Sequence, residues 1–367
     1  MSVDARRQAR TARQARTARQ SAPTYVIRTR AFSAAVSRRH VVACLALGIA
    51  ALVLALVDLG VGELWIPPGD ILGALLADSF VHTVVVEWRM PRIAAAIVFG
   101  AALGLSGAIL QTLTRNPLGS PDMVGLDAGA YTAVAVTILV LGVRDYLAIG
   151  VAAIVGAAVV SAAIYLLAWR RGIQGFRLIV VGIAVSAMLG ALNNYLITRA
   201  DEFDAIAVGM WGAGSLTSVT WAQVAPASGV VVGLFVVAGA FWPRLRQLEL
   251  GDDAARSHGV RADRVRLVLL AVCVVSIATV TAVAGPIAFV ALAAPQIGQR
   301  ITRSAGLGLA ASALAGAVLL VAADILSVLS AVFLSAVPVG LVALSLGGVY
   351  LAWLLVRETR RRRRGAS

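Results

Sequence analysis

The chain has 367 residues, of which 60% are hydrophobic and only 14% are charged, and its formal net charge is +14 at pH 7. Such a composition is too apolar for a water-soluble core and is typical of a polytopic membrane protein. All 32 basic residues are arginine. Because a P-loop requires a lysine on the nucleotide phosphates, the sequence excludes an ATP site of this kind on the chain itself.

Residues that usually carry metal or redox chemistry are few and scattered. Cys44 and Cys273 each lie inside an apolar run, which predicts inert helix residues rather than a disulfide or an exposed nucleophile. The histidines His40, His82 and His258 lack metal-ligand spacing. We therefore expect no catalytic residue, no metal site and no bound cofactor on this chain.

The first 40 residues form a basic segment. They carry ten arginines against one acid, Asp4, in a repetitive pattern with few large apolar residues. This predicts a disordered or surface-lying cytoplasmic tail, with a nucleic-acid-binding arm as the weaker alternative. The apolar run that follows lacks a small-residue cleavage site, so we interpret it as a retained helix rather than a removed signal peptide.

Apolar runs long enough to cross a bilayer dominate the rest of the chain. Residues 286–298 are shorter and proline-bounded, and we count them as a tenth span. The predicted fold is an all-α polytopic membrane protein with about ten transmembrane helices, in one domain at 41–356 between basic tails at 1–40 and 357–367. The nine clear runs are 41–59, 93–113, 123–142, 147–169, 177–197, 222–242, 266–284, 306–326 and 337–356.

The arginine distribution tests this count, because short cytoplasmic loops hold most basic residues of a membrane protein. Ten spans with both termini in the cytoplasm place 28 of the 32 arginines inside and leave only Arg89, Arg92, Arg144 and Arg199 outside. Nine spans would move Arg300 and Arg303, or the C-terminal arginines, to the wrong face. The charges therefore favour ten spans with both ends cytoplasmic.

A few polar residues interrupt the apolar runs. Asp58, Asp127 and Asp324 each lie close to the end of a predicted span. We interpret them as caps or loop anchors rather than as a proton relay, because a relay needs acids near the midplane. Asn193 and Asn194 either face a pathway or bond a neighbouring helix, and the second interpretation is slightly favoured.

Two loops are long enough to have a role of their own. The outer loop 198–221 alternates glycine and tryptophan around Trp211 and Gly212, which fits either cavity lining or interfacial anchoring. The inner loop 243–265 predicts a short amphipathic helix, with Asp252 and Asp253 in its first turn and Gly259 at its end. That helix either docks a cytoplasmic partner or is a solvated connector.

Five motifs, in order along residues 41 to 356, resemble the permease subunits of ATP-binding-cassette (ABC) importers for iron-siderophores, haem and cobalamin. Each motif is weak alone, and their order and spacing make the match specific. They are Arg89-Met90-Pro91-Arg92; Gly107 through Gln111 to Arg115-Asn116-Pro117-Leu118-Gly119; Leu250-Gly251 to Gly259-Val260; Gly285-Pro286-Ile287-Ala288-Phe289-Val290 followed by Pro295; and Pro338-Val339-Gly340.

The resemblance implies a type II ABC importer permease that translocates a ferric siderophore or similar chelate and is not itself an enzyme. ATP and Mg²⁺ would bind two separate ATPase subunits, and an extracytoplasmic binding protein would deliver the ligand to a pair of permeases. Arg89 and Arg92 would dock the binding protein, whereas Gly251, Asp252, Arg256, Gly259 and Val260 would couple to the ATPase. The gate and pathway would include Arg115, Asn116, Pro117, Gly172, Gly175, Asn193, Asn194, Trp211, Gly212 and Ser215.

Three positions depart from the family pattern. Gln296 follows Pro295 where relatives commonly have histidine, Val328 stands where many have arginine, and Val337 stands where many have glutamate. The missing docking charge favours pairing with a non-identical permease, with membrane lipid around the pair and no nucleic acid. Haem or cobalamin as cargo, and an ion-coupled secondary transporter, are the alternatives; the sequence does not name the chelate.

Overall fold

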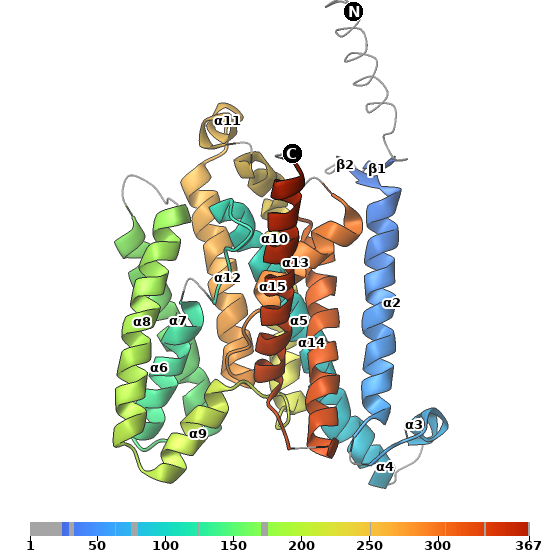
Figure 1. The fold of residues 1–367 in the computed structure, drawn as a ribbon, viewed down its shortest axis with the longest axis vertical. Helices are drawn as coiled ribbons and strands as arrows, with labels where there is room; N and C mark the ends of the chain where they lie inside the picture. The colour runs from blue at the N-terminus through green and yellow to red at the C-terminus, as the bar shows by residue number, and fades with distance from the viewer. Residues whose placement is uncertain are drawn as a thin grey trace, which may run out of the picture.

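The computed structural model is a nearly all-helical bundle (Figure 1). The most apolar helices stand side by side, and α11, the start of α2 and the end of α15 lie at the same end of the bundle. Below, this is called the α11 end. The described residues are 24–28, 33–62, 64–74, 80–122, 125–169, 175–249, 251–304, 306–333 and 335–365.

The long helices follow the predicted apolar runs closely. In the described part of the chain, seven helices are long and apolar enough to cross a membrane, and shorter apolar helices cover Leu126–Leu139 and Val339–Trp353. The helices are α2 (Arg38–Gly60), α5 (Met90–Thr114), α6 (Leu126–Leu139), α7 (Tyr146–Ala168), α8 (Gly175–Arg199), α10 (Trp221–Glu249), α12 (Ala262–Ala284), α13 (Val290–Thr302), α14 (Leu309–Phe333) and α15 (Val339–Gly365).

Short elements connect the long helices. A π-helix, η1 (Thr83–Arg89), runs directly into α5, and α9 (Glu202–Gly212) follows α8 after a sharp reversal. α11 (Asp252–Ser257) lies between α10 and α12. Two further short helices, α3 (Pro68–Ala74) and α4 (Phe80–His82), lie beyond α2 at the end of the bundle opposite α11.

The structure corrects several predicted boundaries. The basic tail includes a two-stranded antiparallel hairpin, β1 (Thr24–Arg28) with β2 (Ser33–Ser37), so the chain is not purely α-helical. α15 continues to Gly365, into the predicted C-terminal tail. The loop 198–221 is helical over α9, because Glu202 and Asp204 lie in a favourable first turn. The predicted span 286–298 begins later, at Val290, because Gly285 and Phe289 adopt positive φ angles that end regular helix before it.

α5 is the central helix of the bundle. In its most apolar window 78% of the residues are buried inside the chain, against 22% for α2 and for α7. It packs against α14 along a glycine-lined contact. A Cβ atom added at Gly100 would overlap the Gly316 carbonyl, and one added at Gly104 would overlap the Ser312 carbonyl. The two backbones therefore touch directly, which is how helices gain contact energy in lipid.

A methyl group at Gly104 should break this contact. We expect Gly104→Ala to destabilise the protein by about 1 to 3 kcal/mol, because the added carbon has no space between two backbones. Thermal unfolding of the purified protein in mild detergent measures the effect. Gly48→Ala in α2 is the matched control, since no atom lies within 4 Å of its added Cβ. Equal melting temperatures for the two variants would contradict the packing argument.

Candidate transport and docking site

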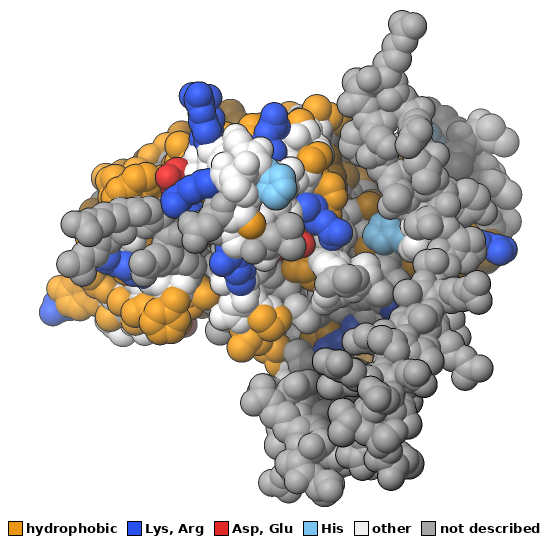
Figure 2. All heavy atoms as spheres, turned by 90° about the horizontal axis from the view of Figure 1, so that it is seen from above, with side chains coloured by type: hydrophobic (Ala, Val, Ile, Leu, Met, Phe, Trp, Pro, Cys, Tyr) orange, Lys and Arg blue, Asp and Glu red, His pale blue; other side chains and the backbone are white. Residues whose placement is uncertain are grey.

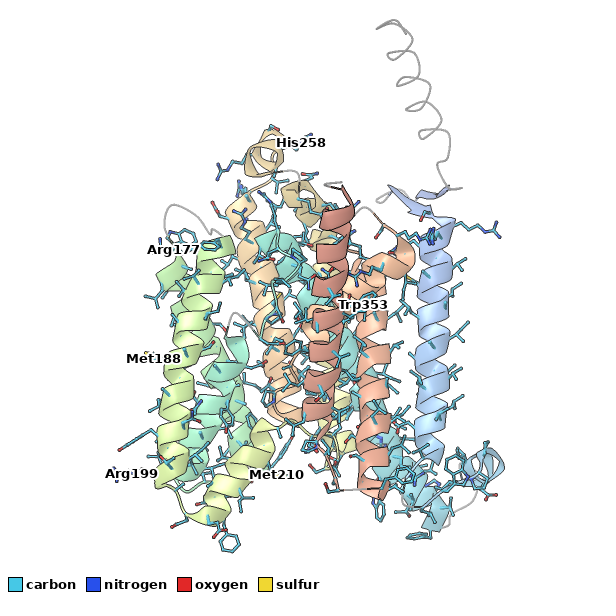
Figure 3. All side chains as sticks on the ribbon, viewed as in Figure 1. Arg177, Met188, Arg199, Met210, His258 and Trp353 are labelled. Carbon is cyan, nitrogen blue, oxygen red and sulfur yellow. The ribbon has the colours of Figure 1, made fainter. Side chains whose placement is uncertain are left out.

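An open cavity of about 650 Å³ lies at the end of the bundle opposite α11. It is bounded by the end of α2, by η1 and the start of α5, by the α9–α10 loop and by the α14–α15 junction. Arg89, Arg92 and Ser215, three of the predicted site residues, all line it, together with Met210 of α9 (Figure 3). The structure therefore brings the predicted docking arginines and part of the predicted pathway to one cavity, called the outer cavity below.

Arg92 forms a buried ion pair with Asp324 across the α5–α14 contact. Its Nε donates to both Asp324 carboxylate oxygens, at 3.0 and 2.8 Å, and its Nη2 donates to Oδ1 at 2.7 Å. The Asp324 side chain is fully buried and the Arg92 side chain is 17% exposed. Asp58 of α2 is also buried and interacts electrostatically with both Asp324 and Arg92. The interpretation of Asp58 and Asp324 as caps or loop anchors is wrong, because both side chains are buried inside the bundle.

Arg89 stabilises the loop that follows α2. Its Nη1 donates to the Leu59 carbonyl at 2.6 Å and its Nη2 donates to the Leu64 carbonyl at 2.5 Å. The side chain fits against Gly62, where an added Cβ would lie 2.7 Å from Nη2. Both predicted docking arginines thus have intramolecular partners, and the guanidinium of Arg89 is the one at the rim rather than in the helix contact.

Three loop segments meet in a glycine-lined backbone junction beside the outer cavity. Ser215 N–H donates to the Ala284 carbonyl at 2.7 Å, and Gly340 N–H donates to the Gly214 carbonyl at 3.0 Å. A Cβ at Gly214 would overlap the Pro286 carbonyl, and one at Gly340 would overlap the Ala213 carbonyl. The α9–α10 loop, the α12–α13 loop and the start of α15 therefore touch through main-chain atoms, with no room for a side chain between them.

Trp211 and Gly212 connect this junction to α6. The Trp211 ring stacks on Tyr131 with a centroid distance of 6.2 Å and an interplanar angle of 10°. Gly212 lies against the same Tyr131 ring, which a Cβ would meet at 2.5 Å. The neighbouring Met210 and Ser215 line the outer cavity, whereas Trp211 and Gly212 do not, so both sequence interpretations of these two residues stay open.

Two helices begin part of the way through the bundle. α6 has 14 residues and α13 has 13, which gives each a length of roughly 20 Å against a hydrocarbon core of about 30 Å. Their entry loops are joined, because Asp122 accepts a hydrogen bond from Phe289 N–H at 2.8 Å. Asp127, in the first turn of α6, accepts one from the Thr281 hydroxyl at 3.0 Å. Asp127 is therefore a helix-to-helix anchor.

The predicted inner gate residues surround a second cavity, of about 400 Å³, at the α11 end. Arg115, Asn116 and Pro117 line it. Arg115 ends α5 in the left-handed region with φ 50°, and its Nη2 donates to the Leu248 carbonyl at 2.8 Å. Asn116 accepts a hydrogen bond from Leu118 N–H through its side-chain oxygen. The motif thus ties the end of α5 to the end of α10.

Gln296, which departs from the family pattern, has a defined partner in this structure. Its Nε2 donates to Gln111 Oε1 at 2.8 Å, and Gln111 Nε2 donates in turn to the Leu292 carbonyl at 3.0 Å. The sequence analysis names Gln111 only as part of a motif and does not predict its pairing with Gln296. Two amide side chains inside apolar helices could have indicated that pairing, because buried polar side chains need hydrogen-bond partners.

The predicted short helix in the inner loop is confirmed as α11, although the loop around it is shorter because α10 extends to Glu249. Gly251 precedes α11, Asp252 is its first residue and Arg256 lies in its last turn. Gly259 turns with φ 78°, and Val260 N–H donates to the Ala255 carbonyl at 3.0 Å. His258 marks the tip in Figure 3. Figure 2 shows arginine side chains gathered on this end face.

The remaining predicted pathway residues lie on α8 or outside the described chain. Gly172 falls in 170–174, outside the described residues, and Gly175 is the first residue of α8. Asn193 is buried, and its Oδ1 has no donor among the described residues, whereas Asn194 is exposed. Neither asparagine lines the outer cavity or the inner cavity. The α8 residues are thus separate from both cavities.

A bundle of long apolar helices with an open cavity near each end is typical of a multi-pass membrane protein. The chain belongs to the FecCD transport family, whose model matches residues 49–357. It is 44% identical over 330 residues to the ferric enterobactin transport system permease protein FepG of Escherichia coli, covering 89% of this chain and 99% of that protein.

More distant relatives carry other cargoes in their names. The chain is 34% identical over 280 residues to the hemin transport system permease protein HmuU of Yersinia pestis, covering 75% of this chain and 83% of that one. It is 33% identical over 328 residues to the vitamin B12 import system permease protein BtuC of Salmonella schwarzengrund, covering 88% and 97%. A solved structure of a metal-chelate-type ABC transporter in an inward-facing conformation has the same fold, with a TM-score of 0.75, 22% identity and coverage of 86% and 99%.

Removing the Asp324 carboxylate should leave the buried Arg92 without its hydrogen-bonded counter-charge, with Asp58 as the carboxylate that still interacts with it. We expect Asp324→Asn to cost about 1 to 3 kcal/mol of stability, because the desolvated guanidinium loses charge-assisted hydrogen bonds that Asp58 replaces only in part. Thermal unfolding in detergent measures the loss. Asp204→Asn is the matched control: it breaks the Arg144–Asp204 pair, in which Arg144 is 68% exposed, and should cost less than about 1 kcal/mol. Similar losses in both variants would argue against a structural role for the buried pair.

Proposed function

We propose that this chain is the permease subunit of an ABC importer that carries a ferric siderophore or similar metal chelate into the cytoplasm. Family membership over residues 49–357 is the observation that carries this proposal, and the 44% identity to a ferric enterobactin permease favours a siderophore over haem or cobalamin. Energy would come from ATP and Mg²⁺ on separate ATPase subunits, since the chain lacks the lysine of a P-loop. The importer would have a type II permease fold.

The proposed orientation places the α11 end in the cytoplasm and the outer cavity on the opposite side of a bacterial plasma membrane. Three features support it. The arginine count favours both termini inside, the described start of α2 and end of α15 share the α11 end, and arginines gather on that face. In this orientation the seven long apolar helices, together with α15 and the half-depth α6 and α13, would make the ten proposed crossings.

The outer cavity is the proposed docking face for the extracytoplasmic binding protein. Arg89 lies at its rim, where a carboxylate of the binding protein would add a second partner to a guanidinium already held by two carbonyls. Such rim pairs set orientation and association rate more than affinity. Arg92 would act on the binding protein through its positive electrostatic potential rather than through a direct contact, because its Nε and Nη2 atoms already donate to Asp324.

The α11 segment, Gly251 to Val260, is the proposed coupling element for the ATPase. It projects from the end of the bundle and is anchored at its base by the near-buried Ala255 and Val260. The inner gate would lie around Arg115, Asn116 and Pro117, with Gly172 and Gly175 on the α7–α8 connection.

A paralogous second permease would supply the docking charges absent at Val328 and Val337. Isolation of a fully active transporter that contains only this permease would exclude that pairing.

Transport assays with the assembled importer test the proposed function. We expect vesicles that contain this chain, its second permease, the ATPase subunits and the binding protein to accumulate a ferric siderophore only when ATP is supplied. ATP-dependent uptake of haem or cobalamin instead of a siderophore would contradict the proposed cargo but support the proposed ATP-driven mechanism. Uptake that continues without ATP and collapses with the proton gradient would show an ion-coupled carrier.

A charge change on α11 tests the coupling role. We expect Arg256→Glu to reduce ATPase stimulation by the loaded binding protein about tenfold, because it reverses a charge at the proposed contact. ATP hydrolysis by the reconstituted complex is the measurement. Arg244→Glu, which alters an exposed arginine before the end of α10, is the control and should leave stimulation nearly unchanged. Normal stimulation of the Arg256→Glu complex would remove α11 from the coupling site.

A further inference from the structure

The short length of α6 leaves a slot in the side of the bundle. α6 begins only at Leu126, so it does not extend to the α11 end of the bundle. A cavity of about 290 Å³ lies there between α7 and α12, with Leu110 of α5 and Leu126 at its floor and Leu178 of α8 at one side. This slot therefore lies in the half of the bundle nearer to α11.

The walls of the slot are almost wholly apolar. They include Ala158 and Ala162 of α7, and Leu267, Ala271 and Val275 of α12. Its polar groups are already satisfied within the protein, because the Ser161 hydroxyl donates to the Ala157 carbonyl and the Cys273 thiol donates to the Ser106 carbonyl.

The slot is open at the side of the bundle, where Leu267 is 50% exposed and Val275 is 42% exposed. In a membrane that opening faces hydrocarbon, so its natural occupant is an acyl chain.

The end of the slot nearest α11 is polar and aromatic. Tyr165 and Trp169 lie together there, with a centroid distance of 5.4 Å, as interfacial aromatics do. Asp263 and Arg264 precede Leu267 by four and three residues, so both share its side of α12. Both are exposed, and Asp263 is close enough to Tyr165 to interact with it electrostatically. Of the described residues of α12, Asp263 and Arg264 thus bring a carboxylate and a guanidinium to the mouth of the slot.

We propose that this slot is a specific phospholipid site that holds one acyl chain between α7 and α12 and a phosphatidylethanolamine head group at its mouth. The phosphate accepts hydrogen bonds from Arg264, and the primary ammonium donates to Asp263. A purely anionic head group would meet the Asp263 carboxylate instead. The inference rests on the chain spanning a membrane, a part of the proposed function, and is independent of the transported cargo.

Lipid retention tests the site without any transport assay. The full chain is exchanged into nanodiscs of equimolar phosphatidylethanolamine and phosphatidylglycerol with matched acyl chains, released into detergent, and analysed by native mass spectrometry at rising collision energy. We expect one lipid to remain per chain after bulk lipid is stripped, with phosphatidylethanolamine favoured about fivefold, as one additional charge pair allows. Asp263→Asn should bring this ratio to about one, and Arg264→Gln should weaken the retention of both lipids.

Substitutions that fill the slot provide a second test of the lipid site. Ala162→Trp should abolish the retained lipid, whereas Ala163→Trp, at the next and equally exposed position outside the slot, should not. Equal retention in these two variants, or a lipid ratio that Asp263→Asn leaves unchanged, would overturn the proposal. If Ala162→Trp fails to fold, the exposed Asp263→Asn and Arg264→Gln variants decide the question alone. A failure here would leave ATP-driven uptake unaffected, so the two proposals are separately testable.

Discussion

Direct backbone contact between α5 and α14 is the constraint on which the rest of the structure depends. In lipid, helices gain no hydrophobic reward for association, so close approach must supply the contact energy. Glycines at positions 100, 104 and 316 allow that approach. α5 also touches α10, α12 and α13, so a shift of the α5–α14 pair would move both entry loops of the half-depth helices and the walls of both cavities.

Polar contacts then fix the register that small residues alone leave open. Glycine and alanine surfaces fit one another at several offsets along a helix, whereas the Arg92–Asp324 pair and the Gln111–Gln296 pair are each satisfied at one offset only. One pair lies near the outer cavity and the other near the inner cavity. These two polar pairs, at opposite ends of α5, therefore fix its position against α14 and α13.

The sequence predicts the helices well because apolar runs and bilayer length restrict them so strongly. It also locates α11, whose acids and closing glycine are local signals. It fails where the answer depends on two distant segments. Asp324 looked like a span-end anchor because nothing local shows that Arg92, 232 residues away, lies beside it. The start of α13 was misplaced for a similar reason, since the backbone at Phe289 is held by Asp122 from another loop. Arg89 and Arg92 were predicted on the outer face as docking residues, a role that stays a prediction, and their intramolecular partners were not foreseen.

The junction of Gly214, Gly285 and Gly340 joins three segments through carbonyls and α-carbons alone. The geometry of a junction made of main-chain atoms does not depend on which side chains lie beside it. Residues that face the outer cavity and have no structural contact of the kind made by Arg89 and Arg92 can therefore change in size and polarity without disturbing the frame, provided that the glycines stay. This separation offers a physical reason why one permease frame is shared by proteins named for cargoes as different as ferric enterobactin, hemin and vitamin B12.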